Sequence, residues 1–446
     1  EVPFGRWDQA LYPLYKQDLE TGKITKAQAL ELLEAFLIKT NEFEFMLHNK
    51  ARLFEDGNSS RLTLTIGGVD QEGGDATNEL SYLFLEALSN TRMVRPNPAV
   101  RLHQGTPEPF LDRVTEIMAS GANTIQIFND KAIIQGFLDA GFPAADARDY
   151  IIGGCVQPIP KSTYGSVCAA HLVLPKTLEL FLKQRSQAGE FDEFYRDYQA
   201  YLSGIIKNTT KTLQAVDRAH KERLPTTFVS ALTDGTMETG RDVKEGGAKH
   251  NLTGIALLGL GTLADSLMAI KQTVFDERRF TLPELNKMLD RDFSGFEAER
   301  LYLLNKIPKY GNDHDEVDRF VREISDFCSR ELKRYTTFRG GRYSLGVHSE
   351  NGQVVFGLLT GATPDGRKQM EPLSIGAGSA RGREKEGCTA ALKSVSKIDT
   401  SSVISGISVN LKFHPSLLDS QQKILRFRDL ITTYFFDFGG QNLQTT

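Results

Sequence analysis

Cys155 is the residue whose setting most favours chemistry. It stands alone within the stretch GGCVQP, residues 153–158, with no second cysteine near enough in sequence to pair with it. A thiol in such a place is an inert buried group, a metal ligand, a nucleophile or a radical carrier, and most free cysteines are of the first kind. Glycine permits backbone conformations that place the next side chain at a loop tip, and proline stiffens the backbone beyond it. The flanking residues therefore favour a functional thiol.

Histidines decide between two of these uses. No cysteine or histidine lies at metal-ligand spacing from Cys155, and the nearest histidine is His171, so the sequence predicts no metal site there. A nucleophilic cysteine needs a histidine nearby in space, and His171, His250 and His348 are available. None of the three stands in a recognisable hydrolase signature. A cysteine-nucleophile hydrolase stays open as an alternative.

Two further motifs have structural interpretations. The glycine-rich stretch GIALLGLGTLAD, residues 254–265, lacks the third glycine of a dinucleotide-binding loop at the required offset, so we expect it to serve close packing. The stretch TPDGRK, residues 363–368, has the composition of a turn, with Pro364 at its second position. Arg367 would be available for phosphate contact, but a structural turn is the stronger expectation.

Strand and helix patterns alternate along the part of the chain that must position Cys155. Such alternation is typical of a parallel sheet or barrel, in which the loops after the strands carry the chemistry. Cys155 follows directly after one of these strands. Thr25 and Gln28 resemble a capping box, and Asp75 is the expected N-cap of the next helix. The strand patterns cover residues 62–66, 123–128 and 149–153, and the helix patterns cover 19–43, 75–90, 131–141 and 172–219.

Composition excludes several classes of partner. The 446 residues are 40% hydrophobic with a net charge of −4, which predicts one large globular domain with no affinity for nucleic acid or anionic membranes. The four cysteines lie far apart, as expected in a reducing compartment, and we predict a cytoplasmic protein. No apolar run approaches the roughly 20 residues of a membrane span, and EVPFGRWDQ at the start has no signal-peptide pattern.

The order of motifs along the chain resembles the glycyl radical enzymes of the pyruvate formate-lyase superfamily. The branch is the one that contains glycerol and propanediol dehydratases, choline lyase and arylacetate decarboxylases. The resemblance covers essentially the whole chain. It is carried by FGRWDQALYPLYKQD (4–18), GGVDQEGGDATNELSYLFLEA (67–87), VRLHQGTPEPFL (100–111), GGCVQP, SALTDGTMETGRDVKEGGAKHNLTGI (230–255), LLNKIPKYGND (303–313), GATPDGRKQMEPLS (361–374) and LKSVSKID (392–399).

The resemblance implies a fold and an activity. The fold would be a ten-stranded α/β barrel of two parallel half-barrels surrounded by helices, here partial over residues 1–446. Cys155 matches the position at which the family carries a transient thiyl radical, so the chain would be a radical lyase that takes hydrogen from a small organic substrate at a C–C or carbon–heteroatom bond. The implied partners are a radical S-adenosylmethionine activating enzyme and a second copy in a homodimer. No bound metal or organic cofactor is expected.

Two departures from the family pattern bear on function. The Arg-Val-x-Gly-Tyr loop that stores the glycyl radical does not occur in these residues, and we expect that a long N-terminal helical part of the family is also missing. We therefore expect no glycyl radical domain in the chain, with the radical coming from a loop outside it, and a catalytically degenerate partner subunit is an alternative. The family's dehydratases carry Glu two residues after the cysteine, where this chain has Gln157, and an amide cannot take up a proton at neutral pH.

Five residues join Cys155 as site candidates. Gln157 is expected to position the substrate by hydrogen bonds. Tyr343 and His348, on the strand-like stretch RYSLGVHS, are expected to line the pocket. In the alternative of a radical dehydratase or eliminase with a different base, Glu238 or Glu245 would supply the carboxylate.

Overall fold

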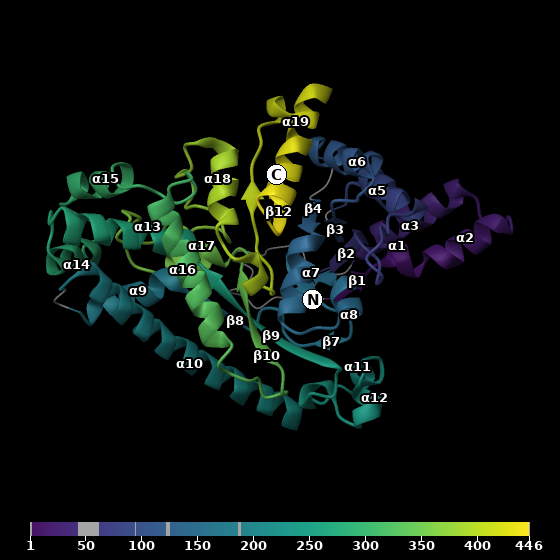
Figure 1. Cartoon of the computed structure of the whole chain (residues 1–446), viewed down its shortest axis with the longest axis horizontal. Helices are drawn as coiled ribbons and strands as arrows, with labels where there is room; N and C mark the ends of the chain where they lie inside the picture. The colour runs from purple at the N-terminus through teal and green to yellow at the C-terminus, as the bar shows by residue number, and fades with distance from the viewer. Residues whose placement is uncertain (1, 43–61, 94, 122–124, 186–188, 446) are drawn as a thin grey trace. The chain divides into compact units, whose positions relative to one another are not determined.

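The computed structural model describes residues 2–42, 62–93, 95–121, 125–185 and 189–445 (Figure 1). The chain forms two compact units where the sequence suggested one continuous domain. The first unit comprises Glu1–Lys161 and Val409–Thr446, and the second comprises Ser162–Ser408. We describe each unit by itself.

The first unit is built on a six-stranded sheet in the order β1-β2-β3-β4-β12-β11. The first four of these strands are parallel, β12 is antiparallel to β4, and β11 is parallel to β12. All residues of β2 and β3 are buried, as in parallel sheets covered on both faces. The strands are β1 (Val2–Gly5), β2 (Leu62–Gly67), β3 (Asn97–Leu102), β4 (Gln126–Asn129), β11 (Asn410–Leu411) and β12 (Asn442–Thr445).

Helices connect these strands as the sequence pattern predicted. They are α1 (Trp7–Ala10), α2 (Tyr12–Glu20), α3 (Lys26–Thr40), α5 (Glu79–Thr91), α6 (Glu108–Ala119), α7 (Asp130–Asp139), α8 (Ala144–Arg148), the short 3₁₀ helix Pro415–Leu417, and α19 (Gln421–Thr432) with its π-helical end Thr433–Asp437. The Thr25–Gln28 capping box is confirmed. The expected N-cap Asp75 is wrong, because Asn78 accepts the N–H groups of Leu80 and Ser81 and starts α5 three residues later. Residues 123 and 124 of one expected strand, and residue 43 of one expected helix, lie outside the described residues.

The second unit contains a four-stranded sheet around β9 (His250–Leu258). The strands β10 (Arg342–Val347), β8 (Ala170–Val173) and β7 (Thr163–Tyr164) all pair with β9 in parallel, β10 along one edge and the other two along the opposite edge. The expected helix over 172–219 is therefore corrected: its start is strand β8, and the rest divides into α9 (Leu174–Lys183) and α10 (Phe191–Arg223). Pro175 in the first turn of α9 suits a helix start.

The remaining helices of this unit pack against the sheet and against one another. The fully buried helix α13 follows β9 directly, and α13 contacts α9 and α16. These helices are α11 (Thr227–Ala231), α12 (Thr236–Thr239), α13 (Leu260–Ile270) with its π-helical end Lys271–Asp276, α14 (Leu282–Asp290), α15 (Glu297–Asn305), α16 (Asp315–Leu332), α17 (Gly352–Leu358) and α18 (Gly387–Ser396), with short 3₁₀ helices at Val243–Glu245 and Thr400–Ser402.

Close packing explains the glycine-rich stretch after residue 253, as the sequence indicated. A Cβ on Gly254 would lie 2.0 Å from the carbonyl oxygen of Val167, one on Gly259 would lie 2.7 Å from Cδ of Pro175, and one on Gly261 would meet the Gly378 carbonyl oxygen at 2.7 Å. Side chains at these positions would push neighbouring backbone away. The stretch therefore holds segments of the second unit together.

The turn at TPDGRK is confirmed. Gly366 N donates to the Thr363 carbonyl at 3.0 Å, which closes the turn around Pro364. Arg367 is buried, and its guanidinium donates to four backbone carbonyls, those of Gly357, Thr360, Gly361 and Glu371. These bonds engage the guanidinium in fixing its own loop, which is a structural role.

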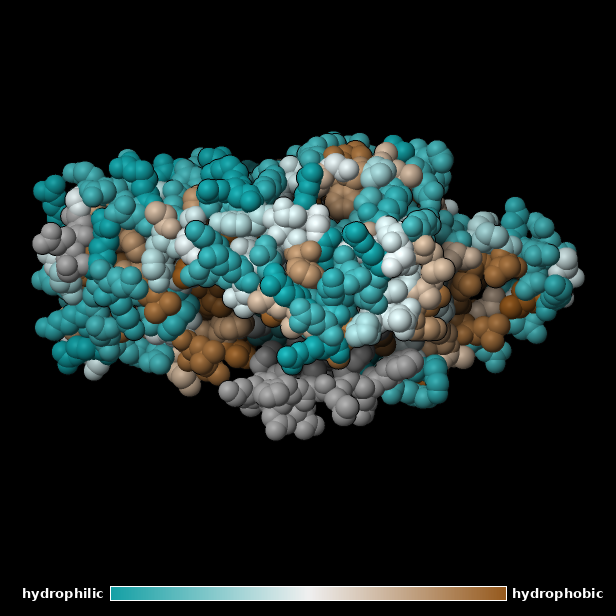
Figure 2. All heavy atoms as spheres, turned by 90° about the horizontal axis from the view of Figure 1, so that it is seen from below, coloured by the Kyte–Doolittle hydropathy of each residue, from teal (hydrophilic) through white to brown (hydrophobic). Residues whose placement is uncertain are grey.

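One face of the molecule is mostly hydrophilic. Figure 2 shows hydrophilic residues over most of the displayed face, with hydrophobic residues in separate patches. Across the described part of the chain, no helix combines the length and the apolar character needed to cross a membrane.

Candidate functional site

Cys155 lies at the tip of a tight hairpin. Strands β5 (Ile151–Gly153) and β6 (Gln157–Ile159) are antiparallel, Gly153 pairs with Gln157, and residues 154–156 form the turn. Gly154 has a φ of 60°, which a side-chain-bearing residue rarely adopts, and Cys155 is partly exposed. The sequence placed Cys155 after a strand, and the structure adds that the chain turns straight back on itself.

Gln157 fixes the shape of this turn. Its side chain is fully buried, and its Oε1 accepts hydrogen bonds from the backbone N–H of Cys155 at 3.1 Å and of Val156 at 3.2 Å. Both partners are donors, so the amide must present its oxygen to them. Gln157 therefore positions Cys155 through the backbone. The expected contact between Gln157 and a substrate stays a prediction.

Two buried threonines of β2 hold the hairpin against the sheet of the first unit. Thr65 Oγ1 accepts the backbone N–H of Ile152 at 3.0 Å, and the hydroxyl of Thr63 donates to the carbonyl of Gly154. Residues two apart on a strand face the same side, so both hydroxyls point to the hairpin. The strand predicted over residues 62–66 thus also carries the polar side chains that support the hairpin.

A buried ion pair anchors the segment that leads into the hairpin. Arg101 binds both carboxylate oxygens of Asp130, at 2.8 and 2.9 Å, and donates to the carbonyls of Tyr150 and Arg148. The Tyr150 hydroxyl donates to Asp130 at 2.7 Å, and the Arg101 guanidinium stacks 3.9 Å from the centre of its ring. Burial, and then the charge of Asp130, raise the pKa of Tyr150 well above its ordinary value. The phenol stays a donor, and the start of the hairpin is rigid.

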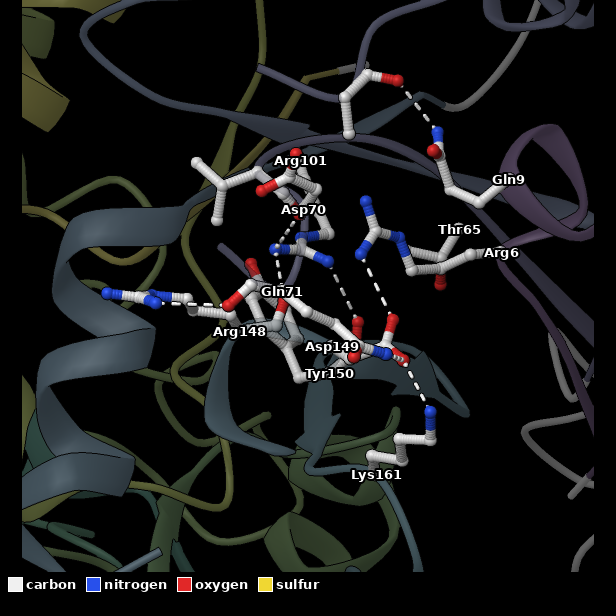
Figure 3. Close-up of polar contacts among 12 residues, drawn as sticks. Arg6, Gln9, Thr65, Asp70, Gln71, Arg101, Arg148, Asp149, Tyr150 and Lys161 are labelled. Atoms are coloured by element: carbon white, nitrogen blue, oxygen red, sulfur yellow. Dashed lines mark hydrogen bonds and ion pairs between the residues drawn. The ribbon is translucent and has the colours of Figure 1, made fainter. Parts of the chain in front are cut away.

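Asp149 adds a second, partly exposed set of contacts beside the first. It forms ion pairs with Arg6 at 3.1 Å and with Lys161 at 3.3 Å, and it accepts a hydrogen bond from Gln71 at 2.9 Å (Figure 3). Burial opposes the charge of Asp149, but the hydrogen bond from Gln71 and the charge of Arg6 outweigh it and lower its pKa. The two residues before β5, Asp149 and Tyr150, are thus both tied to charged partners.

The second unit carries the remaining candidates. Tyr343 lies on β10, is buried, and donates from its hydroxyl to the carbonyl of Thr210 on α10 at 3.2 Å, and burial raises its pKa to about 12. His348 directly follows β10 and is 1% exposed. Pocket-lining roles for both stay predictions, and the hydroxyl of Tyr343 has at least one structural task.

The two carboxylates considered as bases have ordinary surroundings. Glu238 lies on the short helix α12 and is exposed. Glu245 pairs with Lys221 at 2.9 Å, which links the 3₁₀ helix Val243–Glu245 to the end of α10. Neither setting favours a base, because the side chain of Glu238 stands in water and that of Glu245 is engaged by Lys221.

One cluster escaped the sequence analysis. Cys168, His171 and His348 bring ligand atoms within 4.8 Å of one another in the second unit. The sequence does contain one signal, the C-x₂-H spacing of Cys168 and His171. Ligand spacings counted from Cys155 do not include this pair. The contribution of His348 was not visible in the sequence, since 176 residues separate it from His171 (348 less 171, less one).

Comparison with known proteins identifies the family. Residues 1–357 match the profile of the family described as "Pyruvate formate lyase-like". The chain belongs to this family of glycyl radical enzymes. A second profile, "Glycine radical", matches residues 373–446, so the expectation that the chain contains no part of a glycyl radical domain is wrong. The Arg-Val-x-Gly-Tyr loop is not among these residues, and its location elsewhere stays a prediction.

Individual relatives agree with this assignment. The chain is 35% identical to (2S)-3-sulfopropanediol dehydratase of Klebsiella oxytoca over 92% of its own length and 53% of the relative's. It is 29% identical to isethionate sulfite-lyase of Desulfovibrio desulfuricans over 96% of its length and 54% of that protein. The solved structure of the B12-independent glycerol dehydratase from Clostridium butyricum superposes with a TM-score of 0.95 at 36% identity, covering the whole chain and 58% of that structure. The chain thus has the α/β fold of that enzyme and spans little more than half the length of these relatives.

Proposed function

We propose that the chain is the thiol-bearing part of a glycyl radical lyase, in which Cys155 takes a hydrogen atom from a small substrate and returns one to the product. The proposal rests chiefly on one sheet of the first unit. Strand β2 of this sheet supports the Cys155 hairpin through Thr63 and Thr65, and β11 and β12 of the same sheet belong to the segment that matches the glycine radical family.

Asparagines attach this segment firmly to the sheet. Asn129, at the end of β4, donates from its amide to the carbonyls of Phe435 and Gly440, both at 2.8 Å. Asn442 on β12 donates to the carbonyl of Ile127 on β4 at 3.1 Å. Both asparagines are buried, so these bonds are shielded from water. The segment that precedes the radical loop in the family is therefore built into the sheet that carries the thiol's supports.

A glycyl radical, when present, supplies a group that accepts one hydrogen atom. The residues around Cys155 suit this chemistry. The Cys155 thiol gives up the hydrogen atom of its S–H bond and then accepts one from a substrate C–H bond, because the two bonds are similar in strength. Gln157 holds the turn still by its two backbone hydrogen bonds during both transfers. Cys155 is a partly exposed residue at a hairpin tip, where its thiol can face a partner on either side.

The cleaved bond is best sought among carbon–heteroatom bonds. One relative is named a dehydratase and another a sulfite-lyase, so both break such a bond. Gln157 cannot act as a base, and Glu238 and Glu245 have unfavourable settings, so the proton that the substrate hydroxyl releases would go to the leaving group itself or to another residue. Small molecules with a hydroxyl next to a carbon–oxygen or carbon–sulfur bond fit this description. Radical cleavage of a C–C bond is the second expectation.

Activation and assembly are further parts of the proposal. A radical S-adenosylmethionine enzyme would be the activating partner, and a homodimer the assembly, because the family resemblance implies both.

The experiment begins by sequencing the reading frame to its start and stop codons. The whole frame is then expressed without oxygen, together with such an activating enzyme. We expect a spin-resonance signal from a carbon-centred radical, and turnover of a vicinal diol or a hydroxysulfonate. Cys155→Ser should keep the signal and abolish turnover, while the matched control Cys388→Ser should keep both.

Three results would point elsewhere. Activity in air without the activating enzyme, lost on alkylation, would indicate a cysteine hydrolase. A reading frame without the loop, and with no companion chain to supply it, would indicate a degenerate partner subunit. Full turnover by Cys155→Ser would overturn the assignment of the thiol.

A further inference from the structure

The cluster of Cys168, His171 and His348, here called the CHH cluster, is built by the parallel strands of the second unit. Strand β9 lies between β8, which carries His171, and β10, after which His348 follows (Figure 1). In the register, His171 and Gly346 both pair with Ala256 of β9. His348 lies two residues after Gly346, so the two imidazoles share a face of the sheet.

Small residues on β9 and β10 make room for this arrangement. Between the two histidines the sheet presents Ala256 and Gly346, which leave space above the strands. A Cβ on Gly346 would lie 2.7 Å from Nε2 of His348, so only glycine admits the ring where it is. The segment before β8, which carries Cys168, lies against Gly254. The N–H of Ala169 donates to the Gly254 carbonyl at 2.8 Å, and the Gly254 N–H donates to the carbonyl of Ser166 at 2.7 Å.

The distances suit a tetrahedral metal ion. Zinc with a Zn–S bond of about 2.3 Å and a Zn–N bond of about 2.1 Å places those two ligand atoms roughly 3.6 Å apart. Sγ of Cys168 lies 3.6 Å from Nε2 of His171. The ligand atom of His348 lies within 4.8 Å of both.

The state of His348 is an independent observation that points to a ligand. The ring is 1% exposed, and neither nitrogen makes a hydrogen bond within the described structure. A buried polar group without a partner needs an explanation. A neutral imidazole offers the lone pair of one ring nitrogen to a metal ion.

A carboxylate completes the surroundings. Oε1 of Glu350 lies 3.7 Å from Nδ1 of His348. Carboxylates next to metal-binding imidazoles commonly set the ring's orientation and make it a stronger ligand.

We propose that the CHH cluster binds a zinc-class divalent ion through the sulfur of Cys168 and one nitrogen from each histidine, leaving the fourth position open. Coordination displaces the thiol proton of Cys168, so one proton leaves the protein for each ion bound. Three protein ligands with an open position are typical of zinc that polarises a bound molecule, whereas structural zinc has four. The open position would take water or an oxygen of a small molecule.

The competing explanation is a weak hydrogen bond. The Cys168 thiol can donate to Nε2 of His171, or to the carbonyl of Ala170 at 4.0 Å. It accounts for the cysteine and His171, but it gives neither nitrogen of His348 a hydrogen bond within the described structure. The metal accounts for all three side chains.

Titration with Co²⁺ alone tests the proposal. The reduced 446-residue chain, treated with a chelator and kept without oxygen, should bind one Co²⁺ per chain with the strong near-ultraviolet absorption of a sulfur–cobalt bond, and Zn²⁺ should displace it. Cys168→Ser should lose the absorption, and His171→Gln should bind at least about 100-fold more weakly, since loss of an outer partner alone costs 10–100-fold. The matched controls Cys388→Ser and Cys155→Ser should bind as the unaltered chain does.

Each outcome is decisive. Absence of Co²⁺ binding at micromolar concentrations, or an unchanged spectrum in Cys168→Ser, would overturn the proposal. Loss of the absorption in Cys155→Ser with retention in Cys168→Ser would assign the metal to another thiol. If His348→Ala does not fold, Gly346→Ala tests the same ring by displacing it, and unchanged affinity there would count against His348 as a ligand. The titration needs no radical, so it can fail or succeed independently of the proposed lyase activity.

Discussion

Gln157→Met replaces the side-chain amide beneath the Cys155 turn with a thioether and leaves the volume of the side chain almost unchanged. The N–H of Val156, which is buried, would lose its acceptor, and such an orphaned group costs about 1–3 kcal/mol. Cys155 is a partly exposed residue, so water can replace the acceptor of its N–H, and this lost bond would cost about 0.5–1.5 kcal/mol. We expect the free energy of unfolding to fall by about 2–4 kcal/mol.

Urea denaturation measures this loss through the midpoint at an unchanged slope. Alkylation of Cys155, followed by mass spectrometry of its peptide, reports the turn itself and should become faster in Gln157→Met. Gln157→Glu keeps an oxygen acceptor for both N–H groups, so its alkylation rate should match that of the unaltered chain.

Gln126→Met is the matched control in the same unit. Gln126 is also buried, but its Oε1 accepts no hydrogen bond within the described structure, so the substitution orphans no N–H group. A change of less than about 0.5 kcal/mol in the free energy of unfolding is typical of neutral surface substitutions. If Gln157→Met changes this free energy by no more than that, and if Cys155 is alkylated at the same rate, then Gln157 does not hold the turn.

Three further predictions concern burial and packing. Arg101→Met leaves the carboxylate of Asp130 buried and unpaired, so it should cost about 3–5 kcal/mol by urea denaturation and speed alkylation of Cys155, and a stable variant would contradict the anchoring role. Burial raises the pKa of Asp265 from 3.8 to about 7, so the folded chain holds a proton that the unfolded chain has lost, and stability should fall by up to about 4 kcal/mol between pH 4 and 7. Asp265→Asn should lack that share of the pH dependence. If the stability of the two proteins falls equally steeply with pH, Asp265 is not the group responsible. Gly254→Ala would place its Cβ 2.0 Å from the carbonyl oxygen of Val167 and should cost about 1–3 kcal/mol, whereas an unchanged midpoint would show that the segment before β8 can move away.

Much of the fold was predictable from local patterns. Alternation located β2, and the Thr25–Gln28 capping box located the start of α3, because both depend on residues close in sequence. The order of motifs identified the family, and the family profile over residues 1–357 confirmed it. The helix expected over 172–219 failed at its start, since residues 170–173 become a strand only through pairing with β9, some 80 residues further on, as in Leu172 with Leu257 (257 less 172 is 85).

The sequence by itself determined that a solitary cysteine follows a strand and two glycines, and that Gln157 cannot serve as a base. Only the tertiary structure decided what Gln157 does instead, because its two partners are defined by the path of the turn rather than by its side-chain type. In the same way, the C-x₂-H spacing was present in the sequence, but its third member was not. Parallel strands bring together residues that are distant along the chain, and the register of β8 and β10 on β9 is what places His348 beside His171.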